Sequence, residues 1–312
     1  MAGLEKKYLA IVNPASRSGR TAALLNDIDG LFAHLGSDVQ IVSTTGPGHA
    51  EELAAAHASA FDVIIAVGGD GTVHEVSKGL LKAERGAAMA VIPAGTGNDF
   101  ARMMGMQSEI EAAARQLSDA KVLNSDAGTI RFADNAGQQE SHFINAVGIG
   151  FDGFAASLAP RYKHLPFNIG YLVTVLRALL SWRASSVSVS DTTLNEPISA
   201  KMFMITIGNA MDSGGGFRIN PRASLVDGLL DACLVSEVSI MRALRLLPTA
   251  ARGAHLEFPE VQYWQTPKLS IQTELPMPIH ADGEMLTHTA TQIEVEILRG
   301  ALPICIPEST DL

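Results

Sequence analysis

The sequence predicts an α/β protein: an N-terminal doubly wound parallel sheet followed by a second, mainly antiparallel β-sandwich domain. In the first third of the chain, short β-branched runs alternate with amphipathic helical runs, which is the pattern of repeated βαβ units. After about Leu117 most runs are strand-like, and two helical stretches interrupt them. We therefore expect one domain over residues 1–122 and a second over 123–298. The tail from about 299 to 312 is a candidate for packing back onto the first domain.

The elements of the first domain alternate along the chain. The expected strands are Tyr8–Val12, Val39–Ser43, Val63–Val67 and Ala88–Ile92. The expected helices are Thr21–Leu35, His49–Ser59, Val73–Lys82 and Ile110–Leu117. In the second domain the expected strands are Val122–Ile130, Phe143–Val147, Val187–Val189, Met202–Ile207, Leu229–Val235, Val261–Tyr263, Leu269–Ile271 and Ile293–Leu298. The two helical stretches are Phe154–Trp182 and Ser239–Leu256.

Composition restricts the classes of partner. The formal net charge of −10 argues against a general nucleic-acid binder, which needs a basic surface. The same charge opposes overall attraction to anionic lipid, so any membrane contact has to be local. The only two cysteines, Cys233 and Cys305, lie in apolar runs without metal-binding spacing. We expect a cytoplasmic protein, with peripheral contact at the inner face of the membrane left open.

Polar and small residues follow each predicted strand of the first domain. They are Asn13-Pro14, Thr44-Thr45, Gly68–Gly71 and Pro93–Asp99. Ligands of parallel sheets bind beyond the carboxyl ends of the strands. These four segments therefore predict one pocket.

The run Gly68-Gly69-Asp70-Gly71-Thr72 follows a buried strand and opens a helix. Glycines let backbone N–H groups approach phosphates, and a helix N-terminus favours anionic oxygens. The Asp70 carboxylate would supply a hard oxygen for Mg²⁺ or for a substrate hydroxyl. The alternative is an ordinary Asp-Gly turn closing a βα connection.

A second loop of small residues, Pro93–Asp99, follows the next strand and precedes another helix. On its own it could be a helix N-terminus capped by Asn98 or Asp99. Two such loops at adjacent strand ends together favour phosphate binding.

These motifs resemble the diacylglycerol kinase catalytic-domain family, specifically its soluble bacterial lipid kinases. That family is related to sphingosine and ceramide kinases and, more distantly, to NAD kinases and phosphofructokinases. The resemblance covers nearly the whole chain. It is carried by Asn13–Ser16 with Gly19, Gly68–Thr72 with Glu75-Val76, Gly95–Arg102, Asp126 with Gly128, Gly150–Asp152, Gly208-Asn209, Gly214–Gly216, Asp227-Gly228 and Asp282–Glu284.

The resemblance implies an ATP- and Mg²⁺-dependent kinase with an NAD kinase-like N-terminal domain. It would transfer the γ-phosphate to a hydroxyl of a membrane lipid, diacylglycerol or a related glycerolipid. The implied nucleotide-binding residues are Asn13, Pro14, Ser16, Gly19, Thr44, Gly68, Gly69, Asp70, Gly71, Thr72, Val73, His74, Thr96 and Asn98, with Asp126 in the Mg²⁺–water network. The first loop is longer than the compact family form, so the choice among Ser16, Arg17 and Ser18 stays open, as does Thr45 in place of Thr44.

By the same resemblance, Glu284 is the implied proton acceptor, with Asp70 as the competing base. A lipid hydroxyl is a weak nucleophile and needs a carboxylate within hydrogen-bond reach. Without the resemblance, the run around Glu284 would be interpreted as an exposed Asp-Gly hairpin turn.

The run from Ser224 to Leu229 matches a structural Mg²⁺ loop of bacterial members. The implied ligands are the Ser224 carbonyl, the Asp227 carboxylate and the Leu229 carbonyl, a suitable set for a hard cation. A plain Asp-Gly turn before the next strand is the alternative.

Three further features bear on function. Gly148–Gly153 matches the dinucleotide fingerprint GxGxxG, but no acidic residue stands about twenty residues on, and we interpret the match as a coincidental backbone turn. The apolar helix Phe167–Trp182 and the arginine-bearing helix Ser239–Leu256 could face lipid, although packed amphipathic helices are the commoner explanation.

The alternatives to a lipid kinase are an NAD kinase-like enzyme of a soluble substrate and a non-catalytic nucleotide-binding regulator. A homodimer is also open, since dimers are common for such folds.

Overall fold

The computed structural model describes residues 6–16, 21, 28–35, 39–83, 86–162 and 167–310. The chain forms two compact units: unit 1 is Met1–Ala127 with Arg299–Leu312, and unit 2 is Gly128–Leu298. It passes from unit 1 into unit 2 within strand β5 (Ala120–Asp134) and returns within strand β13 (Glu284–Pro307).

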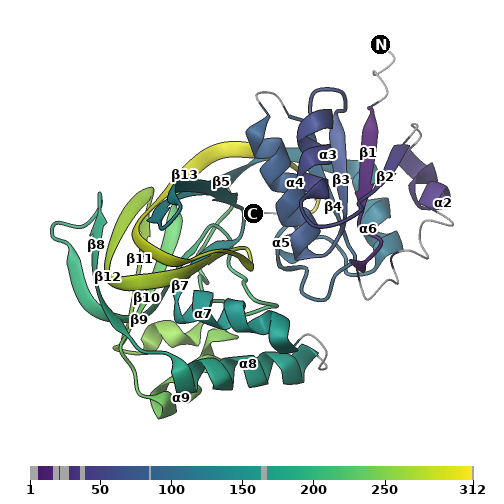
Figure 1. Ribbon diagram of the computed structural model, residues 1–312. Coiled ribbons are helices and arrows are strands. Elements are labelled where there is room, and N and C mark those ends of the chain that lie inside the picture. Colours follow the sequence, from purple (N-terminus) through teal and green to yellow (C-terminus); the bar gives the residue numbers. More distant parts are fainter. Residues whose placement is uncertain are drawn as a thin grey trace. The chain divides into compact units, whose positions relative to one another are not determined.

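Unit 1 is built on a parallel sheet (Figure 1). Its strand order is β2 (Val39–Ser43), β1 (Tyr8–Val12), β3 (Val63–Gly68), β4 (Ala88–Pro93) and then the end of β13. Every residue of β1, β3 and β4 is buried, as expected of a parallel sheet covered on both faces. The connecting helices are α2 (Ile28–Phe32), α3 (His49–His57), α4 (Asp70–Lys82), α5 (Asp99–Met103) and α6 (Ile110–Gln116), with a 3-10 turn at Ala33–Leu35. Helix α3 packs against α4, and α2 contacts α6.

Unit 2 is mainly antiparallel. The strands β11 (Val261–Thr266), β10 (Leu230–Ser236), β9 (Ile198–Gly208), β7 (Ala146–Gly150), β12 (Lys268–Ala281) and β13 follow one another in that order. Strand β8 (Ser185–Asp191) pairs with both β12 and β9, and β5 forms a hairpin with β6 (Gly137–Phe143). The predicted α/β fold with a second, β-sandwich domain is confirmed.

Two apolar clusters stabilise unit 2. One lies among the strands and includes Ile149, Ile205 and Leu234, all fully buried. The other joins α7 (Phe151–Leu158), α8 (Phe167–Ser181) and α9 (Ile240–Ala250) through residues such as Leu158, Val175 and Ala243. Burial of such side chains is the main driving force for folding.

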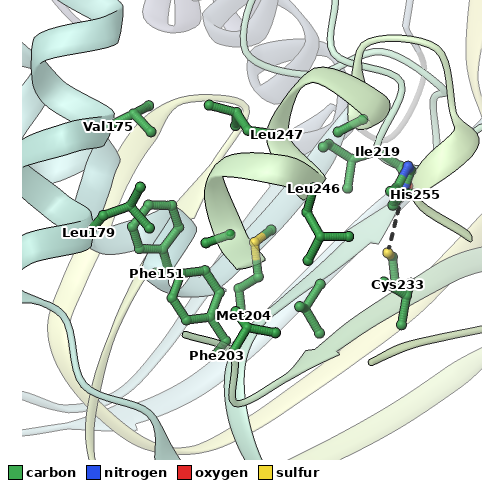
Figure 2. Close-up of a pocket in the computed structure, with 15 residues that line it drawn as sticks. Phe151, Val175, Leu179, Phe203, Met204, Ile219, Cys233, Leu246, Leu247 and His255 are labelled. Carbon is green, nitrogen blue, oxygen red and sulfur yellow. Dashed lines mark hydrogen bonds between the residues drawn. The ribbon is translucent and has the colours of Figure 1, made fainter. Parts of the chain in front are cut away.

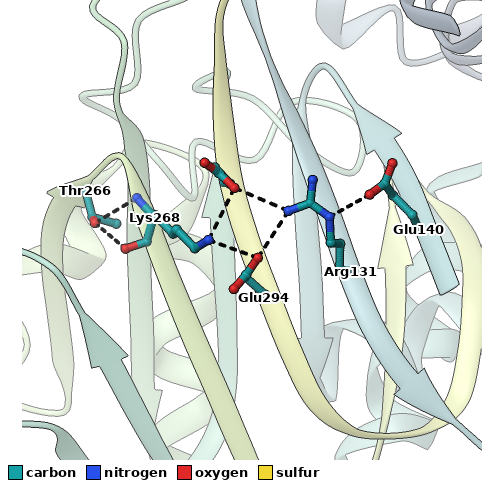
Figure 3. Close-up of polar contacts among 6 residues, drawn as sticks. Arg131, Glu140, Thr266, Lys268 and Glu294 are labelled. Carbon is teal, nitrogen blue, oxygen red and sulfur yellow. Dashed lines mark hydrogen bonds and ion pairs between the residues drawn. The ribbon is translucent and has the colours of Figure 1, made fainter. Parts of the chain in front are cut away.

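An ion-pair cluster lies on the strands of unit 2 (Figure 3). Arg131 of β5 contacts Glu140 at 2.6 Å and Glu294 at 3.1 Å, while Lys268 contacts Glu294 at 3.0 Å. These side chains are partly exposed, so each pair adds little stability alone. The cluster joins β5 and β6 to β12 and β13.

The structure divides three of the predicted elements. The predicted strand Phe143–Val147 is divided, because β6 ends at Phe143 and β7 begins at Ala146. The predicted helical stretch Phe154–Trp182 is two helices, α7 and α8. The stretch Ser239–Leu256 ends as an α-helix at Ala250 and continues as a 3-10 turn, Ala254–Glu257.

Of the predicted helix Thr21–Leu35, only residues 21 and 28–35 are described. Within the part of the chain that the structure describes, none of the helices has the length and apolar character needed to cross a bilayer.

Candidate functional site

Hydrogen bonds between the segments that follow β1–β4 continue the register of the sheet beyond the strands. The Asn13 N–H donates to the Val67 carbonyl at 2.9 Å, and the Ala94 N–H donates to the Gly68 carbonyl at 2.7 Å. The Thr44 N–H donates to Val12 at 2.8 Å. The polar segments predicted at the carboxyl ends of the strands therefore lie side by side along one edge of the sheet in unit 1.

The two glycine loops of unit 1 meet backbone to backbone. A Cβ atom on Gly95 would lie 2.4 Å from the Gly69 Cα, and one on Gly69 would lie 3.0 Å from the Gly95 Cα. No side chain can occupy the space at Gly95 without moving the other loop. This close approach is the physical reason for glycine at position 95.

The Asp70 carboxylate joins the first glycine loop to the second. Its two oxygens accept the N–H groups of Asn98 at 2.7 Å and Asp99 at 2.6 Å. Asn98 has a left-handed backbone, with φ of 55°, and its amide exchanges hydrogen bonds with the backbone of Gly95 at 2.9 and 3.1 Å. Burial and the nearby Asp99 raise the pKa of Asp70, while the hydrogen bonds from the two backbone N–H groups lower it and only partly offset this rise. The loop conformation thus depends on a carboxylate at position 70.

The loop after β1 is tied to the start of helix α4. The Asn13 side-chain amide donates to the Thr72 hydroxyl at 2.9 Å, and its carbonyl oxygen accepts the Ala15 N–H at 3.0 Å. A Cβ on Gly68 would lie 2.4 Å from the same Thr72 hydroxyl, so glycine is needed there too. Pro14 and Ser16 are half-buried. Gly19, Arg17 and Ser18 lie outside the described residues.

The remaining predicted nucleotide-binding residues divide by exposure. Gly71 and Thr96 are exposed, whereas Thr44, Val73 and His74 are buried. Helix α4 begins after Gly69 without a side-chain cap. The first N–H groups of a helix lack partners within it and favour an anion.

Two carboxylates of unit 1 hold backbone in place. Asp126 is buried, and its carboxylate accepts the Gly300 N–H at 2.7 Å, which joins β5 to β13. Glu75 on α4 accepts the N–H groups of Gly48 at 2.9 Å and Ala50 at 3.1 Å, and so caps helix α3 from outside. The motif that contains Glu75 does not predict this role, because the contacts join two different helices.

In unit 2, Glu284 begins β13 directly after a tight turn. Asp282 and Gly283 both have positive φ, 49° and 85°. The Asp282 carboxylate accepts the N–H groups of residues 144–146, each at 2.9 Å. These bonds explain why the predicted strand Phe143–Val147 is interrupted. Glu284 itself is exposed.

The predicted Mg²⁺ loop is a turn before β10. Asp227 is exposed and accepts the Leu229 N–H at 2.9 Å, and Gly228 has a φ of 73°. The Ser224 hydroxyl accepts the Val226 N–H at 3.3 Å. Among the residues that the structure describes, no group of three His, Cys, Asp or Glu side chains could hold a metal ion. A site with one carboxylate and backbone carbonyls would not form such a group, so this ligand set stays a prediction.

An apolar pocket in unit 2 was not predicted (Figure 2). It has a cavity volume of about 80 Å³ and lies among helices α7, α8 and α9 and strands β9 and β10. Its lining includes Phe151, Leu179, Met204 and Leu246, with His255 and Cys233 at one side. The sequence indicates such a pocket only weakly, because apolar residues at helical spacing are also typical of helices in any packed core.

Comparison with known protein families gives two matches. Residues 7–130 match the diacylglycerol kinase catalytic domain, and residues 145–306 match the YegS C-terminal NAD kinase beta sandwich-like domain. The chain is 33% identical over 282 residues to a diacylglycerol kinase of Mycobacterium tuberculosis, covering 89% of this chain and 88% of that protein. It is 28% identical to a diacylglycerol kinase of Bacillus subtilis, covering 89% and 90%.

Solved structures agree in fold. A diacylglycerol kinase structure from Bacillus anthracis str. Sterne superposes with a TM-score of 0.71 at 22% identity and covers all of both chains. The yeast NADH kinase superposes with a TM-score of 0.54 at 11% identity, covering 99% of this chain and 85% of that one. At these identities the likeness is one of fold alone. The family matches and the Mycobacterium tuberculosis relative show more: the chain belongs to the diacylglycerol kinase family of lipid kinases.

Proposed function

We propose that this protein transfers the γ-phosphate of ATP, in the presence of Mg²⁺, to a hydroxyl of diacylglycerol or a related glycerolipid. The observation that carries the proposal is the backbone contact of Gly69 with Gly95 beside the uncapped start of helix α4. Two glycine loops at a helix N-terminus offer closely spaced N–H groups to a phosphate chain.

In this proposal the chain's own residues shape the nucleotide site. Asp70 holds the second loop through Asn98, and Asn13 holds the start of α4 through Thr72. Thr96 of the second loop is exposed, and its hydroxyl can donate to a phosphate oxygen. The arrangement fits phosphoryl transfer, in which catalysis depends mostly on positioning and electrostatics.

The donor chemistry of unit 1 suits Mg²⁺, because carboxylate oxygens are the hard ligands that this ion takes together with substrate phosphates. Asp70 directly follows Gly69 at the start of α4 and is the first candidate, and Asp126 is the second. When bound, Mg²⁺ would neutralise the charge that develops on the phosphoryl oxygens.

We assign the proton acceptor to Glu284 rather than to Asp70. Both Asp70 oxygens already accept backbone N–H groups, whereas Glu284 is exposed and follows a turn that Asp282 holds in place. As the lipid hydroxyl attacks phosphorus, its proton would pass to the Glu284 carboxylate and the leaving oxygen would stay on ADP.

The apolar pocket of unit 2 supports a lipid acceptor. Its lining is aliphatic and aromatic, which suits an acyl chain and offers little to a charged soluble substrate. Cys233 and His255 are its polar members, and burial raises the pKa of Cys233 to about 12 and lowers that of His255, so both are neutral near pH 7.

Helix α8 supports a local contact with the membrane. Ile169, Leu172, Leu176 and Leu180 are exposed at helical spacing, between 39% and 63%. Val175 and Leu179 of the same helix are buried and line the pocket. Helix α8 contains no acidic residue, although the chain as a whole has a net charge of −10. An apolar face of this kind beside a lipid pocket fits peripheral contact with a bilayer.

The test is a phosphorylation assay with labelled ATP and a panel of diacylglycerol, phosphatidylglycerol, ceramide and sphingosine in mixed micelles, run in parallel with NAD. We expect labelled diacylglycerol product that requires Mg²⁺. Label in NADP alone would support the NAD kinase-like alternative, and no labelled product from folded, nucleotide-bound protein would support the non-catalytic one.

Membrane contact is tested by flotation with anionic vesicles. Leu172→Glu combined with Leu176→Glu should release the protein from the vesicles. The matched control Leu275→Glu changes an exposed leucine of β12, outside helix α8, and should not. Equal flotation of both variants would contradict the assignment to α8.

A further inference from the structure

The run Gly148–Gly153 matches a dinucleotide fingerprint but lies in unit 2. In the structure its glycines allow close packing. A Cβ on Gly148 would lie 2.2 Å from both the Asp152 carboxylate and the His280 Nε2. A Cβ on Gly153 would lie 2.4 Å from the Pro278 carbonyl oxygen. These glycines therefore let the β7–α7 corner pack against the end of β12, the strand that leads to Glu284.

Gly148 lies against the contact between His280 and Asp152, which is an ion pair only when His280 is protonated. The His280 Nε2 lies 3.1 Å from the Asp152 Oδ2, and the His280 side chain is only 5% exposed. The Thr206 hydroxyl donates to the same oxygen at 3.4 Å. Burial lowers the pKa of His280, but attraction to Asp152 outweighs it, so the pKa is raised.

The other imidazole nitrogen holds the turn. The Gly283 N–H donates to the His280 Nδ1 at 3.2 Å. From the opposite side, the Asp282 N–H donates to the Ala146 carbonyl at 2.9 Å, and the Asp282 carboxylate accepts N–H groups of residues 144–146. The residues directly before Glu284 are thus fixed both by β7 and by His280.

We propose that Asp152 and His280, seated on Gly148, are positioning residues that hold the turn from which Glu284 presents its carboxylate. The proposal rests on the proposed function, in which Glu284 accepts the proton of the lipid hydroxyl. Asp152 binds the Nε2–H and so leaves Nδ1 as the acceptor for Gly283, much as an orienting carboxylate fixes the tautomer of a histidine elsewhere.

The contact between His280 and Gly283 should depend on pH. Protonation places a hydrogen on Nδ1, which then cannot accept the Gly283 N–H, and the turn loses that contact. The charged groups that face His280 are Asp152 from α7 and Asp282 from the turn, while β7 and β9 contribute Gly148 and Thr206. Lowering the pH through the His280 pKa should therefore reduce kcat.

Two substitutions separate the roles of the two nitrogens. In His280→Asn the amide oxygen lies near the place of Nδ1 and can still accept from Gly283. In His280→Gln the amide reaches the place of Nε2 and can still contact Asp152, but the acceptor for Gly283 is lost. We expect His280→Gln to lower kcat by about tenfold with KM for ATP unchanged, and His280→Asn to keep most of kcat and to lose the acidic fall that His280 causes. His288→Gln, at an exposed histidine of β13, is the control.

Nitrogen-15 NMR of the wild-type histidines gives a readout that needs no activity. We expect the His280 ring to be the Nε2–H tautomer above its pKa, identified by the signal that His280→Asn removes. An Nδ1–H tautomer would overturn the proposal whether or not the protein phosphorylates lipid. Equal kcat for His280→Gln and wild type would also overturn it, while absence of wild-type activity on every lipid with the expected tautomer would refute the proposed function instead.

Discussion

The carboxylate of Asp70 accepts the Asn98 N–H across 2.7 Å and thereby joins the loop after β3 to the loop after β4. The Asn98 side chain bonds Gly95 within the second loop, whereas the Asp70 carboxylate connects the two loops. Because Gly69 and Gly95 touch at the same place, the shape offered to a phosphate chain depends on the acid at position 70. Asp70 therefore has a structural role in addition to any contact with Mg²⁺.

Asp70→Asn should lower kcat by about 100-fold or more, because an amide cannot accept both N–H groups and carries no charge for a cation. Steady-state phosphorylation of diacylglycerol measures it. Asp134→Asn is the control, since Asp134 also accepts a nearby N–H, that of Ala136 at 2.8 Å, in the β5–β6 turn of unit 2. Similar losses in both variants would point to a general effect on folding.

Gly95→Ala should weaken ATP binding by about tenfold or more, because its Cβ would push the two loops apart. Calorimetric titration with ATP measures the affinity. Gly46→Ala serves as the control, because a Cβ there meets nothing within 4 Å. Unchanged affinity of Gly95→Ala would mean that the phosphates bind elsewhere.

The sequence sufficed for the elements whose ends carry turn residues. Strands β1 and β2 have the predicted bounds, Tyr8–Val12 and Val39–Ser43, because each β-branched run stops at a polar or small residue. The parallel sheet followed from the alternation of these runs with helices. The lipid kinase family was also confirmed, since its motifs are long and specific.

Other features depended on contacts between distant segments. The single strand predicted at Phe143–Val147 was wrong, because Asp282 takes the N–H groups between β6 and β7. The role of Gly148 needed the positions of Asp152 and His280, which lie far from each other in the sequence. The apolar pocket could not be predicted, because the hydrophobic pattern of α8 does not say whether its inner face meets protein or a cavity. The roles assigned to the individual nucleotide-site residues, Glu284 and Asp227 remain predictions.

Glu284→Gln should lower kcat by about 100-fold while ATP affinity stays within about twofold, because the amide keeps the shape but cannot accept a proton. Pre-steady-state transfer to diacylglycerol, combined with ATP titration, separates the two effects. Glu274→Gln, at an exposed glutamate of β12, is the matched control. Full activity of Glu284→Gln would indicate that Asp70, not Glu284, is the proton acceptor.

Ala243→Phe should fill part of the pocket, since Ala243 is buried in its lining on α9. We expect KM for a long-chain diacylglycerol to rise by about tenfold, a smaller rise for a short-chain one, and no change in KM for ATP. Ala136→Phe, at an exposed turn position, is the control. Equal effects on both chain lengths would argue that acyl chains bind elsewhere.

The Asp152–His280 pair should contribute to the free energy of unfolding only within a limited range of pH. Burial alone would raise the pKa of Asp152, but His280 outweighs it and lowers the pKa, while the pKa of His280 is raised. The pair's contribution is therefore fully present between about pH 4 and pH 6.5, the unfolded values of the two groups. It is lost as the pH rises through the raised pKa of His280 and as it falls through the lowered pKa of Asp152.

Urea denaturation of wild type and Asp152→Asn at several pH values measures this contribution. We expect the variant to be less stable by about 1 kcal/mol inside the window and to approach wild type outside it. A difference that does not vary with pH would contradict the charge interaction.

The most direct measurement is a crystal structure of the protein with a non-hydrolysable ATP analogue and Mg²⁺. We expect the phosphates to lie at the start of α4, with oxygens in hydrogen-bond contact with N–H groups of the loops that contain Gly69 and Gly95. An analogue bound in good order at any other place on the chain would contradict it.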